Sequence, residues 1–218
     1  GVSTIGMILF TSRPVGDAMA TTIWGTASSW TLTALPLFVW MGEILFRTRL
    51  SENLFKGLSP WMQKLPGGLI HVNVVGCALF AAISGSSAAT VATVGKMSIP
   101  ELRKRKYPEK ILLGSLAGSG TLGLLIPPSI ILIIYGVTVQ ESIAKLFIAG
   151  IFPGIMIALI FMSYVIIWSL ANHKIMPKVH ETSSFLDKIK KSKQLLPVIL
   201  LILGVIGSIY TGVATATE

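Results

Sequence analysis

The sequence predicts an all-α membrane protein with several membrane-crossing helices, and three observations indicate this fold class. Hydrophobic residues make up 52% of the 218 residues and charged residues only 12%, about half the charged share of a soluble domain. The apolar residues gather in runs of about 20, the length that spans a bilayer. The basic residues are confined almost entirely to the connections between those runs. The net charge of +9 therefore reports orientation in a membrane and does not indicate a nucleic-acid partner.

The predicted spans are apolar runs with sharply defined connections. Three connections are strongly basic, and the positive-inside rule places them in the cytoplasm: 47–64, 96–110 and 172–193. Two connections contain a single base, Arg13, and are expected outside: 12–29 and 138–141. The runs themselves are 30–46, 111–137, 142–171 and 195–213, with 1–11 expected to be the tail of a span whose start lies outside this sequence.

The first segment, 1–66, is expected to form scaffold helices and an amphipathic arm. Between residues 50 and 66, leucines and Trp61 recur at helical spacing among Lys, Glu, Asn and Gln. This pattern predicts a helix that lies along the inner membrane surface.

The apolar stretch 67–95 predicts a re-entrant helical hairpin. Both flanking connections are basic, so the stretch must enter and leave on the same side. Two helices of about 14 residues would each reach only about 20 Å into a core about 30 Å thick. The turn is expected near the bilayer centre, at Ser84 to Ser87, where irregular backbone is tolerated only if it lines a site.

The run 111–137 predicts a broken helix, because Pro127 and Pro128 remove two backbone donors in its middle. A plain proline kink is the structural alternative. Discontinuous helices paired with hairpins are where secondary transporters hold anions and coupling cations. Residues 67–137, with the hairpin at 67–95 and the broken helix at 111–137, are therefore expected to carry the site of a secondary transporter.

The remaining residues, 138–209, are expected to add transmembrane helices around the cytoplasmic loop 172–193. Residues 210–217 faintly repeat residues 83–90, with three identities. Such self-similarity is typical of inverted-repeat transporters. Segment 210–218 is accordingly expected to start a second hairpin that is cut off at Glu218.

No enzymatic motif is present in the sequence. It has no phosphate-binding glycine loop, no zinc-type histidine pair and no paired cysteines. We therefore expect no enzyme and no cofactor. For the isolated polar residues we expect bland roles: a hydrogen-bonded buried His71, an interhelical bond from Asn73 and an i,i+4 pair between Glu43 and Arg47.

The predicted hairpin tip differs from these, because it brings hydroxyl groups and turn backbone together. Hydroxyl and carbonyl oxygens are hard ligands suited to Na⁺. The N-terminus of the second hairpin helix also favours an anionic substrate group. The alternative is that the small residues only allow tight helix packing. The expected substrate-facing residues are Ser87, Ala88, Thr90 and Ser129.

Several motifs, in order along the chain, resemble the large membrane subunit of tripartite ATP-independent periplasmic (TRAP) transporters. The most specific is Gly-Thr-Leu-Gly at 120–123 followed by Ile-Pro-Pro-Ser at 126–129. The others are His-Val-Asn-Val at 71–74, Ile-Ser-Gly-Ser at 83–86, Ala-Gly-Ile-Phe-Pro-Gly at 149–154 and Thr-Ala-Thr-Glu at 215–218. Two positions depart from the usual family pattern, Thr90 in place of an aspartate and Ala216 in place of a proline.

The resemblance implies Na⁺-coupled import of a small organic acid, of the dicarboxylate or sialic acid type, across the bacterial inner membrane. It implies two partners besides the bilayer, a small four-helix membrane subunit and a periplasmic substrate-binding protein. It also implies the first half of an inverted-repeat, elevator-type transporter, in which the transport elements 67–137 move against a scaffold. Na⁺ is the only implied ion. Its implied ligands are Ser84, Gly85, Ser86, Ser87, Thr90, Gly120, Thr121, Pro127, Pro128 and Ser129, with Thr215, Thr217 and Glu218 at the second hairpin.

Two alternatives stay open at this level. A Na⁺/divalent-anion symporter that needs no binding protein would use the same hairpin and broken-helix logic. A non-transporting structural subunit of a membrane complex would use its small residues only for packing.

Overall fold

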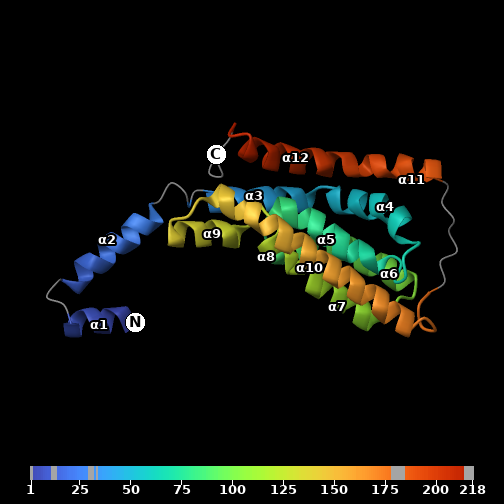
Figure 1. The fold of residues 1–218 in the computed structure, drawn as a ribbon, viewed down its shortest axis with the longest axis horizontal. Coiled ribbons are helices and arrows are strands. Elements are labelled where there is room, and N and C mark those ends of the chain that lie inside the picture. The colour runs from blue at the N-terminus through green and yellow to red at the C-terminus, as the bar shows by residue number, and fades with distance from the viewer. Residues whose placement is uncertain (1, 11–13, 29–31, 33, 178–184, 214–218) are drawn as a thin grey trace.

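The computed structural model describes residues 2–10, 14–28, 32, 34–177 and 185–213, and throughout these ranges the regular structure is helical. Figure 1 shows long helices packed side by side, with two N-terminal helices extending away from them. The helices are α1 (Val2–Phe10), α2 (Val15–Ala27), α3 (Ala34–Arg47), α4 (Leu50–Met62), α5 (Ile70–Ser84), α6 (Ser87–Lys104), α7 (Glu109–Gly120), α8 (Leu122–Leu125), α9 (Ile130–Val139), α10 (Ile143–Ala171), α11 (Phe185–Ser192) and α12 (Leu196–Tyr210), with a 3₁₀ turn at Lys193–Leu195.

Helix α5 forms the centre of the packed body. It contacts α3, α4, α6, α7, α8, α10 and α12. Most of its side chains are fully buried, among them Ile70, Val74 and Phe80. It is apolar on all sides, the pattern of a helix surrounded by other helices.

Among the described residues, three helical segments are long and apolar enough to cross a bilayer: Glu109–Val139, Ile143–Ala171 and Leu186–Tyr210. They expose large apolar side chains, for example Phe152 and Ile167 on α10 and Leu203 on α12. A water-soluble protein rarely leaves such continuous apolar faces uncovered. The chain is therefore an integral membrane protein, as predicted. Within the span expected at 30–46, the structure describes α3 with an apolar stretch at Leu35–Leu45, and residues 30, 31 and 33 lie outside the described residues.

Two of the predicted connections between apolar runs contain helices. Segment 12–29 includes α2, where the hydroxyls of Thr21, Thr22 and Thr26 donate to carbonyls one turn earlier. These bonds satisfy the threonine hydroxyls within the helix. The scattered polar residues of this segment gave no apolar periodicity from which the helix could be predicted. Segment 172–193 includes α11, in which Phe185, Leu186 and Ile189 recur at helical spacing and lysines occupy most of the other positions.

The second hairpin helix is longer than expected. The stretch was predicted to end at residue 95, but α6 continues to Lys104. Its end is stabilised where the Tyr107 N–H donates to the Leu102 carbonyl and Lys106 takes a left-handed conformation at φ 60°. The apolar run thus ended before the helix did.

The helix predicted between residues 50 and 66 is confirmed as α4. Its apolar side chains Leu54, Phe55 and Leu58 are buried in the two main hydrophobic clusters. The nitrogen of the Trp61 indole donates to the Ser192 hydroxyl at 2.8 Å, which ties α4 to α11. The apolar face of α4 therefore packs on protein rather than lying open toward lipid.

The three basic segments meet at one end of the packed helices. Helix α4 contacts α6, α11 and the 3₁₀ turn, which belong to the segments 96–110 and 172–193. Figure 1 shows α4, α11 and the ends of α6 and α10 at the same end of the body, with α9 and the end of α12 at the other. This arrangement agrees with a common side for all three basic connections.

Candidate functional site

Helices α5 and α6 form a hairpin joined by two residues, Gly85 and Ser86. Gly85 ends α5 in the left-handed conformation, with φ 60°, and its N–H donates to the Ala81 carbonyl. Ser86 is extended and caps α6, since its hydroxyl accepts from the Ala89 N–H at 3.4 Å. The tip is therefore a glycine-dependent turn followed by a serine N-cap.

Three oxygen atoms cluster just inside this tip. The Thr90 hydroxyl lies 2.9 Å from the Ser84 hydroxyl and 2.7 Å from the Ser86 carbonyl oxygen. The Ser84 hydroxyl lies 3.4 Å from the same carbonyl. Ser84 and Thr90 are fully buried. The tip thus holds a compact set of hard oxygen atoms that are hydrogen-bonded to one another.

The predicted break in the next helix is confirmed at residues 126–129, between α8 and α9. In an unbroken helix the Leu124 carbonyl would accept from residue 128, but Pro128 has no N–H. The buried Ser129 hydroxyl replaces that donor and lies 2.6 Å from the Leu124 carbonyl oxygen. The break therefore leaves this carbonyl satisfied by a side chain.

The hairpin tip and the helix break are in direct contact. The Ile130 N–H donates to the Gly85 carbonyl at 3.2 Å. A Cβ atom on Gly85 would lie 2.7 Å from the Pro128 carbonyl oxygen, and one on Gly123 would lie 2.8 Å from the Ser87 nitrogen. Glycine is needed at both positions because backbone meets backbone there. The two irregular elements predicted from sequence are one structural unit.

The remaining predicted residues of the helix break differ in their surroundings. Gly120 faces α6, and a Cβ atom there would overlap the Val91 side chain. Thr121 is exposed and its hydroxyl donates to the Gly118 carbonyl at 2.7 Å. Gly120 thus serves close packing of α7 on the hairpin, while Thr121 lies at the outer surface of the junction.

The expected substrate-facing residues separate into two pairs. Ala88 is exposed and Ser87 is partly exposed at the start of α6. Thr90 and Ser129 are both 0% exposed, with their hydroxyls turned toward Ser84 and Leu124. In this arrangement only Ser87 and Ala88 are open to a substrate.

The isolated polar residues have the bland roles expected of them. The Asn73 amide donates to the Leu112 carbonyl and the Ser115 hydroxyl across to α7, at 3.3 and 3.0 Å. A ring nitrogen of buried His71 lies 2.7 Å from the Pro66 carbonyl oxygen. Glu43 and Arg47 form an i,i+4 ion pair.

Two glycines that contact the tip were not among the predicted site residues. Gly123 packs on the backbone of Ser86 and Ser87, and Gly42 of α3 lies under Ser84, its Cβ position 3.6 Å from that carbonyl oxygen. The Gly-Thr-Leu-Gly motif contained the first of them. Gly42 carries no such signal, because a lone glycine in an apolar helix is common in membrane proteins. Predicted residues Thr215, Thr217 and Glu218 lie outside the described residues.

Comparison with known proteins assigns the chain to a family. The family model "Tripartite ATP-independent periplasmic transporter, DctM component" matches residues 1–218. The C4-dicarboxylate TRAP transporter large permease protein DctM of Pseudomonas aeruginosa is 35% identical over 100% of this chain and 50% of that protein. The sialic acid TRAP transporter large permease protein SiaM of Vibrio cholerae is 34% identical over 89% of this chain and 45% of that protein.

A third relative joins two components in its name. The isethionate TRAP transporter permease protein DctMQ of Oleidesulfovibrio alaskensis is 32% identical over 100% of this chain and 34% of that protein. The chain spans about half the length of the DctM relatives it matches. Because the family model covers the whole sequence, the chain belongs to the DctM family, the large permease component of TRAP transporters.

Proposed function

We propose that the protein is the membrane subunit of a Na⁺-coupled secondary transporter in the bacterial inner membrane. It imports a small organic acid, of the dicarboxylate or sialic acid type, that a periplasmic binding protein hands over. Family membership and relatives named for C4-dicarboxylates and sialic acid support the transport class. This activity is proposed for the whole protein, because the chain spans only about half the length of its DctM relative.

The observation that carries the proposal is the contact between the hairpin tip and the helix break, closed by the 3.2 Å bond from Ile130 to Gly85. A tight turn and an interrupted helix both leave backbone oxygens outside a regular hydrogen-bond ladder. Two such elements meeting at one point form a cation and anion site in secondary transporters.

The hairpin is proposed to be re-entrant. Neither of its helices is among the segments long and apolar enough to cross a bilayer. The 15 residues of α5 rise only about 22 Å, less than the bilayer core of about 30 Å. The basic residues before α5 and at the end of α6 favour entry and exit on the cytoplasmic side.

For the Na⁺ ligands we propose oxygens at the tip and the break. The best-supported are the Ser84 and Thr90 hydroxyls and the Ser86 carbonyl, which already lie within 3.4 Å of one another. Ser129 and the carbonyls of Pro127 and Pro128 complete the facing side. Gly85, Ser87, Gly120 and Thr121 remain candidates through their backbone oxygens, and Thr215, Thr217 and Glu218 are the proposed ligands of a second hairpin.

The transport movement is proposed to be of the elevator type. Residues 67–137 would move as one body against a scaffold formed by residues 1–66, while 138–209 add further membrane helices. Glycine-mediated backbone contact and the Gly85–Ile130 bond support movement of tip and break together, since neither can shift alone without losing that contact.

Two protein partners are proposed, a small four-helix membrane subunit and the periplasmic binding protein. The name DctMQ of one relative, which joins two components, supports the first. The family description, a tripartite periplasmic transporter, supports the second.

The test is uptake of radiolabelled organic acids into proteoliposomes that hold the full-length protein and its small partner. Uptake is expected only with both an inward Na⁺ gradient and binding protein. Uptake that needs Na⁺ but no binding protein would instead identify an ordinary symporter. A Ser86→Leu variant places bulk against Gly123 and removes the α6 cap, so it should lose Na⁺-dependent uptake. The variant should still insert into the membrane.

A further inference from the structure

A groove of about 340 Å³ lies between α7 and α10, two helices that contact each other along one side of the packed body (Figure 1). Both belong to segments long and apolar enough to cross a bilayer. Buried Val74 and Val165 form the floor of the groove, while Ile160 and Tyr164 stand at its rim, 56% and 58% exposed. A molecule in the surrounding bilayer therefore reaches the walls of this groove directly.

The chemistry of the groove suits an apolar ligand. Ser115 also lines it, but the Ser115 hydroxyl donates to the Leu112 carbonyl and accepts from the Asn73 amide, both at 3.0 Å. Beside it, Gly114 leaves open space, since no atom lies within 4 Å of its Cβ position. A narrow hydrocarbon chain fits such a groove, whereas a polar ligand would lose hydrogen bonds to water without replacing them.

A second membrane helix fits the same groove less well. Helices approach each other closely where small residues four apart leave two notches side by side, and Gly114 and Gly118 have that spacing. The notch at Gly118 is already filled, because the Phe161 ring lies 3.6 Å from its Cβ position. Of these two notches only the one at Gly114 stays open, which suits a flexible chain better than a rigid helix.

The depth of the groove matches the inner leaflet, in the orientation that the positive-inside rule predicts. Gly114 lies about 6 Å beyond Lys110 along α7, at about 1.5 Å per residue. Tyr164 and Ile160 lie about 10 and 16 Å before α10 ends at Ala171. Because half of the bilayer core is about 15 Å thick, the groove spans the acyl-chain region of that leaflet.

A lysine stands at the headgroup level above the groove. Lys110 lies one turn before Gly114 on the same face of α7, and helical side chains lean toward the N-terminus, here the cytoplasmic end. Lys110 is exposed, and its side chain makes no ion pair or hydrogen bond with the described residues. The neighbouring carboxylate of Glu109 is paired with Arg103. The charge of Lys110 is therefore available to an anionic headgroup.

We propose that an anionic phospholipid of the inner leaflet binds here, with one acyl chain in the groove between α7 and α10 and its phosphate at Lys110. The groove holds the chain, and the lysine selects for headgroup charge. This inference rests on the orientation used in the proposed function but not on its Na⁺ site, because no residue of the hairpin tip or the helix break lines the groove. Loss of the lipid and loss of Na⁺ dependence are therefore separate outcomes.

The test counts lipids bound to the full-length protein in detergent by native mass spectrometry, during titration with dioleoylphosphatidylglycerol or dioleoylphosphatidylcholine. Phosphatidylglycerol should bind about fivefold more tightly, the effect of about one charge near a headgroup. Lys110→Gln should remove this preference and leave phosphatidylcholine binding unchanged. Lys190→Gln is the matched control and should keep the preference, because Lys190 is exposed on α11, in another basic segment.

A substitution that fills the groove tests the position of the acyl chain. Gly114→Leu places a side chain in the open space, so the tightest-bound lipid of either kind should be lost. Leucine favours a helix more than glycine does, so this variant should unfold at or above the wild-type temperature, which separates lost binding from lost structure. Gly204→Leu on α12 is the matched control, because its Cβ position is equally free of atoms within 4 Å but does not line the groove.

Four results would overturn the proposal. The first two are equal binding of the two lipids and an equal loss of preference in Lys110→Gln and Lys190→Gln. The third is binding of short-chain dihexanoylphosphatidylglycerol as tightly as the dioleoyl lipid, which would show that no chain occupies the groove. The fourth is a Gly114→Leu protein that keeps its lipid, and release of the small membrane subunit from that variant would identify a helix as the occupant.

Discussion

The backbone N–H of Ile130 donates a 3.2 Å hydrogen bond to the carbonyl oxygen of Gly85. Gly85 is the turn of the hairpin, and Ile130 is the first residue of the helix that resumes after the break. The first N–H groups of a helix have no partner within that helix. The Gly85 carbonyl, at the end of α5, therefore supplies the acceptor for the first N–H of α9. The bond joins the two irregular elements of the proposed site.

The glycine contact at this junction predicts a steric effect. Gly123→Ala places a methyl group 2.8 Å from backbone atoms of Ser86 and Ser87, which cannot move without shifting the tip. We expect the free energy of unfolding to fall by about 1–3 kcal/mol and Na⁺-dependent uptake to be lost. Thermal unfolding in detergent and proteoliposome uptake measure the two effects.

Gly114→Ala is the control for this change. It lies on the same broken helix, and no atom lies within 4 Å of its Cβ position. It should unfold at the wild-type temperature or slightly above. Equal losses in the two variants would show that the junction is not tightly packed.

The oxygen cluster in the tip predicts opposite results for two threonines of α6. Thr90→Val removes a hydroxyl that bonds to Ser84 and to the Ser86 carbonyl, so we expect about 1–3 kcal/mol of destabilisation and a higher Na⁺ requirement for uptake. Thr93→Val removes a buried hydroxyl that has no hydrogen-bond partner among the described residues. That variant should be neutral or more stable, with unchanged Na⁺ dependence.

The Na⁺ dependence of uptake and the thermal unfolding temperature should be measured for both variants. They are chemically identical and lie one turn apart in the same helix. A Thr90→Val protein with wild-type Na⁺ dependence would remove Thr90 from the ligand set and leave it a structural residue.

The helix break predicts a special role for one serine hydroxyl. Ser129→Ala leaves the Leu124 carbonyl without a donor, because Pro128 offers none, and should cost about 1–3 kcal/mol. Ser163→Ala on α10 removes a hydroxyl that also bonds to a carbonyl one turn earlier, at Leu159. There the helical N–H of residue 163 remains, so unfolding should hardly change. Similar unfolding temperatures for both variants would contradict the substitute-donor explanation.

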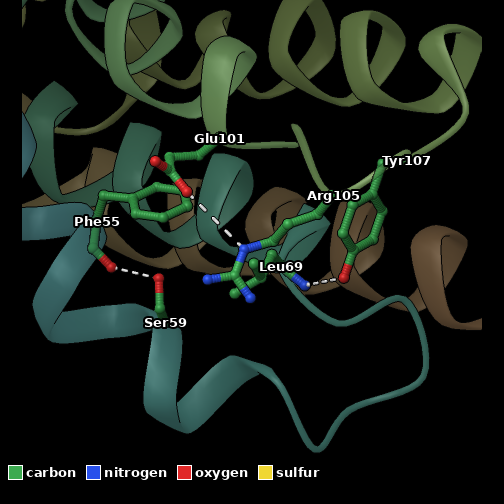
Figure 2. Close-up of polar contacts among 6 residues, drawn as sticks. All are labelled: Phe55, Ser59, Leu69, Glu101, Arg105 and Tyr107. Carbon is green, nitrogen blue, oxygen red and sulfur yellow. Dashed lines mark hydrogen bonds and ion pairs between the residues drawn. The ribbon is translucent and has the colours of Figure 1, made fainter. Parts of the chain in front are cut away.

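The entrance to the hairpin depends on a tyrosine from another segment. The Leu69 N–H, at the start of α5, donates to the Tyr107 hydroxyl at 3.1 Å, as Figure 2 shows. Tyr107→Phe leaves this buried N–H without its acceptor and should cost about 1–3 kcal/mol in chemical unfolding.

Burial raises the pKa of Tyr107 above its usual value of 10.0, although the Leu69 N–H opposes that rise. A raised pKa in the folded state means that its contribution is complete below pH 10 and declines as the pH rises through the raised value. The stability gap between wild type and Tyr107→Phe should therefore be constant from pH 6 to 9. A gap that already closes within this range would contradict the assignment.

The strongest parts of the fold were readable from the sequence for simple physical reasons. Pro127 and Pro128 lack backbone donors, so a break there needs no tertiary information. The tip predicted at Ser84 to Ser87 contains the turn at Gly85 and Ser86 that joins α5 and α6, while the re-entrant course of this helix pair is the proposal made above. Helix α10 begins at Ile143 and ends at Ala171, within one residue of the predicted run.

Other features depend on tertiary contacts that local patterns do not encode. Helix α6 continues past Lys96 because Leu102 is buried in the core, and it ends at Lys104, nine residues beyond the predicted end at residue 95, where Tyr107 terminates it. Helix α2 has no buried residue, so it lacks the apolar stripe by which helices are recognised. The burial of Thr90 accompanies hydrogen bonds inside the hairpin tip, and that of Ser129 accompanies its bond to Leu124 in the helix break, neither of which composition can reveal.

The most direct test of the central claim, that the tip and the break form a Na⁺ site, is alkylation of a cysteine at the tip in the full-length protein. Ser87→Cys places a thiol at a partly exposed position, while native Cys77 is buried. Lys174→Cys, an exposed position beyond α10, is the control. If the tip and the break bind Na⁺, Na⁺ slows maleimide labelling at position 87 relative to equal K⁺ and leaves labelling at position 174 unchanged. Equal labelling rates at position 87 in Na⁺ and K⁺ would contradict it.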